Sequence, residues 1–297
     1  MSESSTDVAR FELGQVRLEP NLLIRQQQDV IERMMRFVMD VLRQRGPLRE
    51  RPSGRDRCNE DPCERQVRGF DVPTQVFSIL ADRGYGKTTA LLAIYNRLCR
   101  GRWPAGIDEE RYRLLMPTII RPEMMRSADA FFPSLCSEIL RAAKDCSRPR
   151  ERGDRRGWME HCVETTPEAL QRDLAQIIEA HITYSPEARE IRRQLAGDVR
   201  EYAEKIIRDD SPDLHGYELF SKWVDDVLYM TCTELLVICI DDVDVCPQFA
   251  PEVLWVLRTY LAHPRIVVIL TARLEGMELA LRDDFLRTIP EVFTGGN

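Results

Sequence analysis

The sequence lacks any long apolar run, since no stretch approaches the roughly eighteen consecutive apolar side chains that make a transmembrane helix. Its N-terminus, MSESSTDVAR, is polar and does not resemble a secretory signal. An excess of positive charge is also missing, because 42 basic side chains are outnumbered by 49 acidic ones, for a net charge of −7. We therefore expect a cytoplasmic protein with no membrane partner, and we expect any nucleic-acid surface to be local.

A cysteine framework is not indicated either, although the chain has nine cysteines. Cys58 and Cys63 lie in a polar segment, but no second pair with matching spacing completes a tetrahedral zinc site. The Trp, His and Cys cluster at residues 158–162 is interpreted as incidental in the same way. Four further cysteines have apolar neighbours: Cys99, Cys136, Cys232 and Cys239. They suit buried thiols in a reducing compartment better than disulfides.

The most informative segment that the chain does contain is QVFSILADRGYGKTTA, at residues 75–90. Residues 76–80 are apolar and β-prone enough for a central strand, and apolar residues at helical spacing continue to Leu98. Between them, Gly84 and Gly86 can adopt positive φ and let backbone N–H groups close around phosphate oxygens. Strand, loop and helix together have the layout of a phosphate-binding P-loop, rather than that of a chance glycine turn.

The loop leads into Lys87 and Thr88 at the start of the expected helix. We expect Lys87 to reach the β and γ phosphates and Thr88 to offer its hydroxyl to Mg²⁺. The full pattern begins with Gly where this chain has Ala81, a compact residue that should preserve the loop. The residues expected to contact the nucleotide are Asp82, Arg83, Gly84, Tyr85, Gly86, Lys87, Thr88 and Thr89. ATP is expected over GTP because no guanine-reading motif is present.

A second chemical feature is the apolar run LLVICI at residues 235–240, which ends in Asp241, Asp242 and Asp244. A continuous apolar run is typical of a strand covered on both faces, and open α/β sheets bind ligands at the carboxyl ends of their strands. Asp241 is expected to hold Mg²⁺, and Asp242 to orient the attacking water or take its proton. Asp244 could cap the helix expected around residues 247–261 or contact the nucleotide site.

A further strand, RIVVIL at residues 265–270, ends in Thr271, Ala272 and Arg273. If it lies beside the strand at residues 76–80, its end faces the γ-phosphate from the side opposite Lys87. Thr271 would then hydrogen-bond the attacking water, and Arg273 would sense or neutralise phosphate charge. The alternative for Arg273 is a surface pair with Glu275 or Glu278.

The remaining helical patterns place these features in an α/β chain. Helices are expected over residues 21–42, 131–143 and 219–228, and a second strand over residues 113–120. Two further helix starts combine an N-cap residue with proline at the first helical position: Thr166-Pro167 and Ser185-Pro186.

Composition suggests how the chain is divided. Its 43% hydrophobic content supports a buried core, whereas residues 43–69 have almost nothing to bury and are interpreted as an Arg-rich linker. We expect an N-terminal helix and linker at residues 1–70 and a nucleotide-binding core at residues 71–297. A helical insertion is expected at about residues 145–215, beginning with an Arg-rich loop.

The combination of ADRGYGKTT, LLVICIDDVD and RIVVILTAR resembles the AAA+ and STAND branch of P-loop NTPases, including KAP-like and NACHT-like ATPases. The resemblance extends from Val72 to about Arg287. It implies a three-layer α/β/α core with a mainly parallel sheet, the ligands ATP and Mg²⁺, and ATP hydrolysis. It also implies the Walker A role for Lys87 and Thr88, and the sensor role for Thr271 or Arg273. In detail the motifs are similar to bacterial antiphage defence ATPases, which would make the chain the nucleotide-driven part of a larger machine.

Three departures and two alternatives accompany this resemblance. Ala81 replaces the first glycine, Asp242 replaces the glutamate usual in AAA+ proteins, and no helical lid or second arginine sensor precedes Asn297, which suggests part of a longer protein. An LSGGQ signature and an NKxD motif are absent, so ABC and Ras-type proteins are not indicated. A P-loop kinase and a nucleotide-gated interaction module with little turnover remain open as alternative functions.

The expected partners are further copies of the chain, bound through ATP-dependent contacts, and an effector protein. Nucleic acid has weaker support as a partner.

Overall fold

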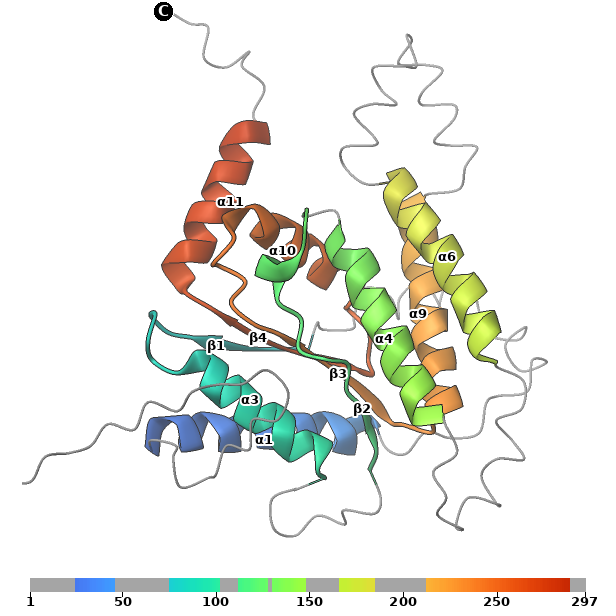
Figure 1. Ribbon diagram of the computed structural model, residues 1–297, viewed down its shortest axis with the longest axis horizontal. Helices are drawn as coiled ribbons and strands as arrows, with labels where there is room; N and C mark the ends of the chain where they lie inside the picture. Colours follow the sequence, from blue (N-terminus) through green and yellow to red (C-terminus); the bar gives the residue numbers. More distant parts are fainter. Residues whose placement is uncertain are drawn as a thin grey trace, which may run out of the picture.

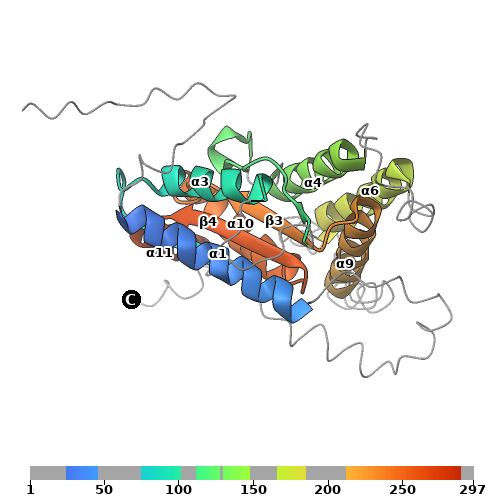
Figure 2. The ribbon, with the colours of Figure 1, turned by 90° about the horizontal axis from the view of Figure 1, so that it is seen from below.

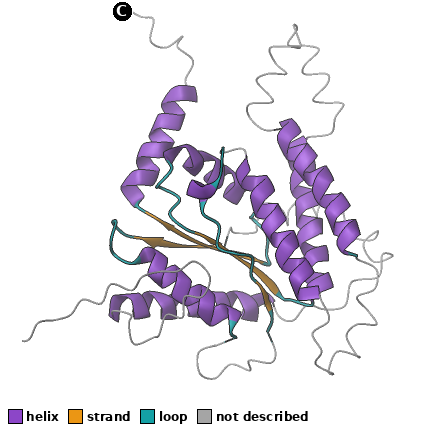
Figure 3. Cartoon of the chain, viewed as in Figure 1, coloured by secondary structure: helices purple, strands orange, loops and turns teal. Residues whose placement is uncertain are grey.

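The computed structural model describes residues 25–45, 75–101, 112–127, 130–147, 166–184 and 212–288. It has a mixed α/β architecture with helices around one sheet (Figures 1 and 3). In chain order the elements are α1 (Arg25–Arg45), β1 (Val76–Leu80), α3 (Lys87–Cys99), β2 (Leu114–Leu115), η3 (Pro122–Met124), α4 (Phe131–Ser147), α6 (Pro167–Tyr184), α9 (Pro212–Thr231), β3 (Leu235–Ile240), η5 (Pro247–Phe249), α10 (Ala250–Thr259), β4 (Ile266–Ala272) and α11 (Leu274–Thr288).

The four described strands form one parallel sheet in the order β1-β4-β3-β2. β4 therefore lies between β1 and β3, and the register pairs Leu80 with Ala272 and Ile240 with Leu270. Because parallel strands end at the same edge of a sheet, the segments after β1, β3 and β4 begin close together. β3 and β4 are buried along their whole length, as their continuous apolar sequences predict.

The two outer strands differ from the sequence predictions. β1 forms an edge of the described sheet rather than a central strand, and its residues Ser78 and Leu80 are exposed. The strand predicted at residues 113–120 is reduced to the two residues of β2, followed by an isolated bridge between Ile120 and Ile240. Pro117 lies between β2 and this bridge, and proline has no N–H to donate to a ladder.

One face of the sheet is covered by α1 and α3, which lie side by side in Figures 1 and 2. Met34 and Val38 of α1 and Leu91 and Ile94 of α3 are fully buried there, against Val237 and other β3 and β4 side chains. On the edge strand, Phe77 packs against Phe37 of α1 with the rings tilted by 40° and their centroids 5.8 Å apart. This packing explains how β1 can be apolar yet lie at an edge, since one of its faces is covered.

The opposite face is covered by α4, α6, α9, α10 and α11 (Figure 1). Aromatic side chains fill the junction of these helices, and Phe132 stacks on Tyr260 with ring centroids 4.1 Å apart. The buried indole N–H of Trp223 donates to the Leu170 carbonyl at 3.0 Å and joins α9 to α6. Helices on both faces of a parallel sheet confirm the predicted α/β class and are compatible with a three-layer α/β/α arrangement.

Several predicted helices are confirmed. The patterns at residues 21–42, 131–143 and 219–228 correspond to α1, α4 and α9. At the start of α6, the Thr166 hydroxyl accepts a hydrogen bond from the Ala169 N–H at 3.2 Å, as an N-cap residue should. The helix predicted at residues 247–261 is divided into η5 and α10.

The predicted burial of four cysteines is half correct. Cys136 and Cys239 are buried, and burial raises the pKa of both thiols. Cys99 is exposed at the end of α3, and Cys232 is half-buried in the turn before β3. Helical periodicity does not predict how buried a residue is at the end of an element, because the neighbouring elements no longer cover the chain there.

Other predictions lie outside the described residues. They concern Cys58, Cys63 and the cluster at residues 158–162, the Arg-rich segments, the helix start at Ser185-Pro186, and the tail from residue 289 onward. Among the described helices, none is long and apolar enough to cross a membrane.

Candidate functional site

The glycine-containing loop joins the end of β1 to the start of α3. Gly84 has φ 90° and Gly86 has φ 74°, a left-handed backbone that favours glycine, as the motif predicts. α1 lies against this loop, where the Gln27 side-chain amide donates to the Gly86 carbonyl at 3.4 Å. A Cβ added at Gly86 would lie 2.0 Å from that amide nitrogen. The loop therefore has the conformation that can turn successive N–H groups toward an anion.

Lys87 is the first residue of α3, and its side chain folds back over the loop. It is buried, with only 8% exposed. Its ammonium donates to the carbonyls of Ala81 at 2.9 Å and Asp82 at 3.2 Å. The positive charge thus lies within the loop at the N-terminus of a helix, where anions bind most readily.

Three oxygen-bearing side chains from distant parts of the sequence meet next to this lysine. Asp241, directly after β3, is 3% exposed. Its Oδ1 accepts hydrogen bonds from the Thr88 hydroxyl at 3.2 Å and from the Thr271 hydroxyl at 2.7 Å. The segment after β3 and the carboxyl end of β4 are therefore linked to the first turn of α3 through Asp241.

Asp242 has an unusual backbone and an altered acidity. Its φ is 50°, a left-handed conformation that aspartate tolerates better than most residues, and such positions cluster at functional sites. Its N–H donates to the Thr271 hydroxyl at 2.8 Å. The pKa of its carboxyl group is raised, first by burial and then by the charge of Asp241, while Lys87 opposes the shift. Asp242 is thus a half-buried acid close to the loop lysine.

Asp244 and Arg273 form a separate pair at the start of α11. The Asp244 carboxylate accepts from the backbone N–H of Arg273 at 2.7 Å and from its Nε at 2.9 Å. Asp244 therefore does not cap the helix that follows it in sequence. Within the described residues Arg273 forms its ion pair with Asp244 rather than with Glu275 or Glu278. Gly276 allows this approach, since a Cβ there would lie 2.9 Å from the Asp244 Cβ.

The sequence predictions missed Arg121, which lies beside Asp241. Its Nε is 3.9 Å from Asp241 Oδ2. The only signal for it is that it directly follows the predicted second strand, and residues at carboxyl ends of parallel strands meet at one edge. Two residues further on, Glu123 contributes to the raised pKa of Asp242.

The other predicted contact residues lie around the loop itself. Asp82, Arg83 and Tyr85 are exposed, and Thr89 is half-buried in the first turn of α3. Within the part of the chain that the structure describes, the hydrogen bonds that join Thr88, Asp241, Asp242 and Thr271 do not include their side chains. They remain predicted contacts.

The Thr88 hydroxyl and the Asp241 carboxylate supply hard oxygen donors at adjacent positions, which fits Mg²⁺. Within the described ranges, no group of three or more His, Cys, Asp or Glu side chains could hold a metal by itself. Such a sparse donor set suits an ion that completes its octahedron with water and phosphate oxygens.

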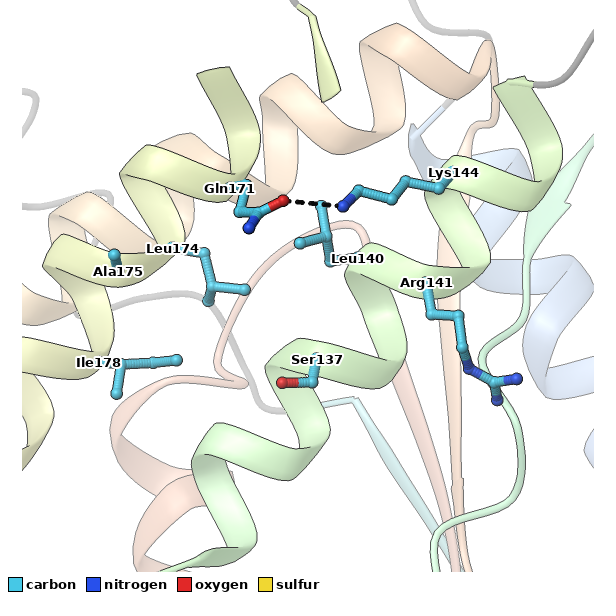
Figure 4. Close-up of a pocket in the computed structure, with 8 residues that line it drawn as sticks. All are labelled: Ser137, Leu140, Arg141, Lys144, Gln171, Leu174, Ala175 and Ile178. Atoms are coloured by element: carbon cyan, nitrogen blue, oxygen red, sulfur yellow. Dashed lines mark hydrogen bonds between the residues drawn. The ribbon is translucent and has the colours of Figure 1, made fainter. Parts of the chain in front are cut away.

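A separate groove of about 430 Å³ runs between α4 and α6 (Figure 4). Its floor is apolar, with Leu140 and Leu174, and its rim is polar, where the Lys144 ammonium donates to Gln171 at 2.9 Å. None of the predicted nucleotide or metal contacts lines it. The chemistry predicted from the sequence is therefore at the strand ends and not in this groove.

No protein-family model matches the chain, and no curated protein matches it.

Proposed function

We propose that this chain binds and hydrolyses ATP as a P-loop ATPase of the AAA+/STAND type. The observation that carries the proposal is the network of Thr88, Asp241 and Thr271 beside Lys87. These four side chains come from α3, from β4 and from the segment directly after β3, and each has the chemistry that its position in an ATPase site requires. The order β1-β4-β3 supports it further, because β4 brings Thr271 between the loop and Asp241.

The glycine loop and Lys87 would hold the phosphates. The Lys87 ammonium now donates to two loop carbonyls, and a phosphate oxygen is a stronger, charged acceptor for the same protons. The N–H groups of residues 84–88 and the α3 N-terminus would add further donors. Asp82, Arg83, Tyr85 and Thr89 are the proposed outer contacts of the nucleotide.

Thr88 and Asp241 would hold Mg²⁺, which neutralises charge on the β and γ phosphates when it is bound. Thr88 is suited to this because its hydroxyl already lies 3.2 Å from Asp241 Oδ1. The Thr271 hydroxyl donates to the same oxygen, Oδ1, at 2.7 Å. The carboxylate is therefore oriented before a ligand arrives.

Asp242 would orient the attacking water and accept its proton. Its raised pKa makes it a better base than an exposed aspartate, because a base is most effective when its pKa approaches the working pH. Thr271 links the Asp242 backbone to Asp241 and would also help to hold the water. Arg273 stays a candidate for sensing phosphate charge.

Self-association would complete the site. Five large apolar side chains are exposed at the carboxyl end of β1 or in the segments that follow the strands: Leu80, Tyr85, Met124, Val245 and Leu274. Exposed apolar groups around a polar site are typical of a contact surface. We propose an ATP-dependent oligomer that signals to an effector protein, in a larger machine such as an antiviral defence system.

A second candidate is a nucleotide-gated interaction module with little turnover. The observation that favours it is the Arg273–Asp244 pair, which holds the arginine Nε 2.9 Å from a carboxylate. While it is so paired, the arginine contributes less positive charge to a phosphate transition state. The chain would then act mainly by binding the nucleotide and only slowly hydrolyse it. A kinase receives no comparable support from the described residues.

The test is equilibrium titration of ATP with Mg²⁺ against the wild type, Lys87→Ala and a matched control, Lys222→Ala. Lys222 is exposed on α9, far along the chain from the loop. The proposal expects wild-type affinity in the control and loss of measurable binding in Lys87→Ala. Equal affinity in all three folded proteins would contradict it.

A further inference from the structure

Arg121 is held beside the predicted metal site by the backbone. The Ile120 N–H donates to the Cys239 carbonyl, and the Asp241 N–H donates to the Ile120 carbonyl, both at 2.8 Å. These bonds place residue 121 next to Asp241 although 120 positions separate them in sequence (241 − 121). The hydrogen bonds between Ile120 and the end of β3 therefore fix the backbone next to Arg121.

The two oxygens of Asp241 have different partners. Oδ1 accepts from the hydroxyls of Thr88 and Thr271, whereas Oδ2 faces the Arg121 guanidinium, with 3.9 Å between Oδ2 and Nε. The Asp241 side chain is 4% exposed, and a carboxylate that is so buried needs a compensating charge. Arg121 is the cation that forms an ion pair with it among the described residues.

The neighbouring acids have other cations. Asp244 is paired with Arg273, and the charge of Lys87 acts on Asp242. Each of the three acids that follow β3 therefore has a basic side chain close to it. Removing Arg121 would leave Asp241 with hydroxyl donors alone.

We infer that Arg121 is the resident counter-ion of Asp241 and that a divalent cation must displace it from Oδ2 when the nucleotide binds. The inference rests on the proposed nucleotide site and names a residue that regulates its metal occupancy. An arginine side chain that is 33% exposed can swing away from Asp241 without unpacking the core. Arg121 thereby sets the divalent-ion concentration at which the site fills.

The test measures Mn²⁺ affinity by electron paramagnetic resonance, with the full chain saturated with ADP. Arg121→Gln removes the competing charge, so the Kd for Mn²⁺ should fall roughly fivefold, the scale of one partly exposed ion pair. Arg121→Lys should stay close to the wild type. Arg258→Gln is the matched control, because Arg258 is exposed in the last turn of α10, outside the proposed site, and its loss should leave the Kd for Mn²⁺ unchanged.

The affinity for ADP without metal, measured on the same proteins, separates the outcomes. Unchanged ADP affinity together with tighter Mn²⁺ binding supports the displacement. Weaker ADP binding by Arg121→Gln would make Arg121 a phosphate contact and overturn it, as would an unchanged or weaker Mn²⁺ affinity. If the wild type binds no ADP at all, the proposed function fails, and the role of Arg121 fails with it.

Discussion

At the scale of single residues, the account depends on what each of three neighbouring acids does. The Asp241 carboxylate accepts hydrogen bonds from two hydroxyl groups. The Asp244 carboxylate accepts from the Arg273 N–H, just before α11. Asp242 has a left-handed backbone and is half-buried, and burial together with the charge of Asp241 raises the pKa of its carboxyl group. It is therefore the acid best suited to react rather than to hold the structure.

We predict that Asp242→Asn keeps ATP affinity and slows hydrolysis roughly a hundredfold, the scale expected for loss of a general base. Asparagine preserves the shape and tolerates the left-handed backbone at this position. Parallel measurement of ATP affinity and phosphate release checks the separation. Asp225→Asn, at an exposed position on α9, serves as the control, and normal turnover in Asp242→Asn would move the catalytic role elsewhere.

The same variant should change how stability depends on pH. Because folding raises the pKa of Asp242, its protonated form is favoured in the folded state, and this stabilisation is lost as the pH rises through the folded pKa. Asp242→Asn removes the unfavourable charge, so its melting temperature should exceed that of the wild type at neutral pH. The difference should shrink toward pH of about 4. A difference that stays constant between these pH values would show that charge is not its cause.

At the scale of elements, the parts that could be predicted are those with a local signal. The apolar runs of β1, β3 and β4 and the proline-marked start of α6 were readable because their causes lie within a few residues. β2 was overestimated because hydrophobicity alone ignores the missing N–H of Pro117. The Arg121–Asp241 and Asp244–Arg273 pairs could not be predicted, since each depends on which strands are neighbours.

The contact between Asp244 and α11 gives a test of this packing. A Cβ at residue 276 would lie 2.9 Å from the Asp244 Cβ. We predict that Gly276→Ala lowers the free energy of unfolding by up to about 2 kcal/mol, because overpacking costs roughly 1–3 kcal/mol and the gain in helix propensity offsets about 1 kcal/mol of it.

Chemical denaturation checks the result, with the exposed Glu278→Ala as a control on the same helix. A Gly276→Ala protein that is as stable as the wild type would mean that α11 can shift away from Asp244.

At the scale of the whole molecule, exposed apolar side chains lie at and after the carboxyl ends of the strands, the same edge of the sheet as the proposed site. Tyr85 is 65% exposed and Met124 is 78% exposed. If neighbouring copies cover this surface, turnover should depend on protein concentration, because an added subunit would supply positive charge and exclude water.

We therefore predict slow hydrolysis by dilute protein and a specific activity that rises with concentration. Met124→Ser with Val245→Ser should remove that rise while preserving ATP binding, because both side chains are exposed and neither is a proposed nucleotide contact. Sedimentation with and without ATP and Mg²⁺ measures the association itself. A monomer whose specific activity is the same at all concentrations would contradict the oligomer.

The central claim is that the loop, Lys87 and the Asp241 network form one ATP-hydrolysing site. Single-turnover hydrolysis tests it most directly, with the full chain in excess over radiolabelled ATP so that bound nucleotide is followed through one cycle. The account predicts conversion to ADP and phosphate that requires Mg²⁺ and is absent from Lys87→Ala but present in Lys222→Ala. Bound ATP that stays intact with Mg²⁺, or equal hydrolysis by Lys87→Ala, would contradict it.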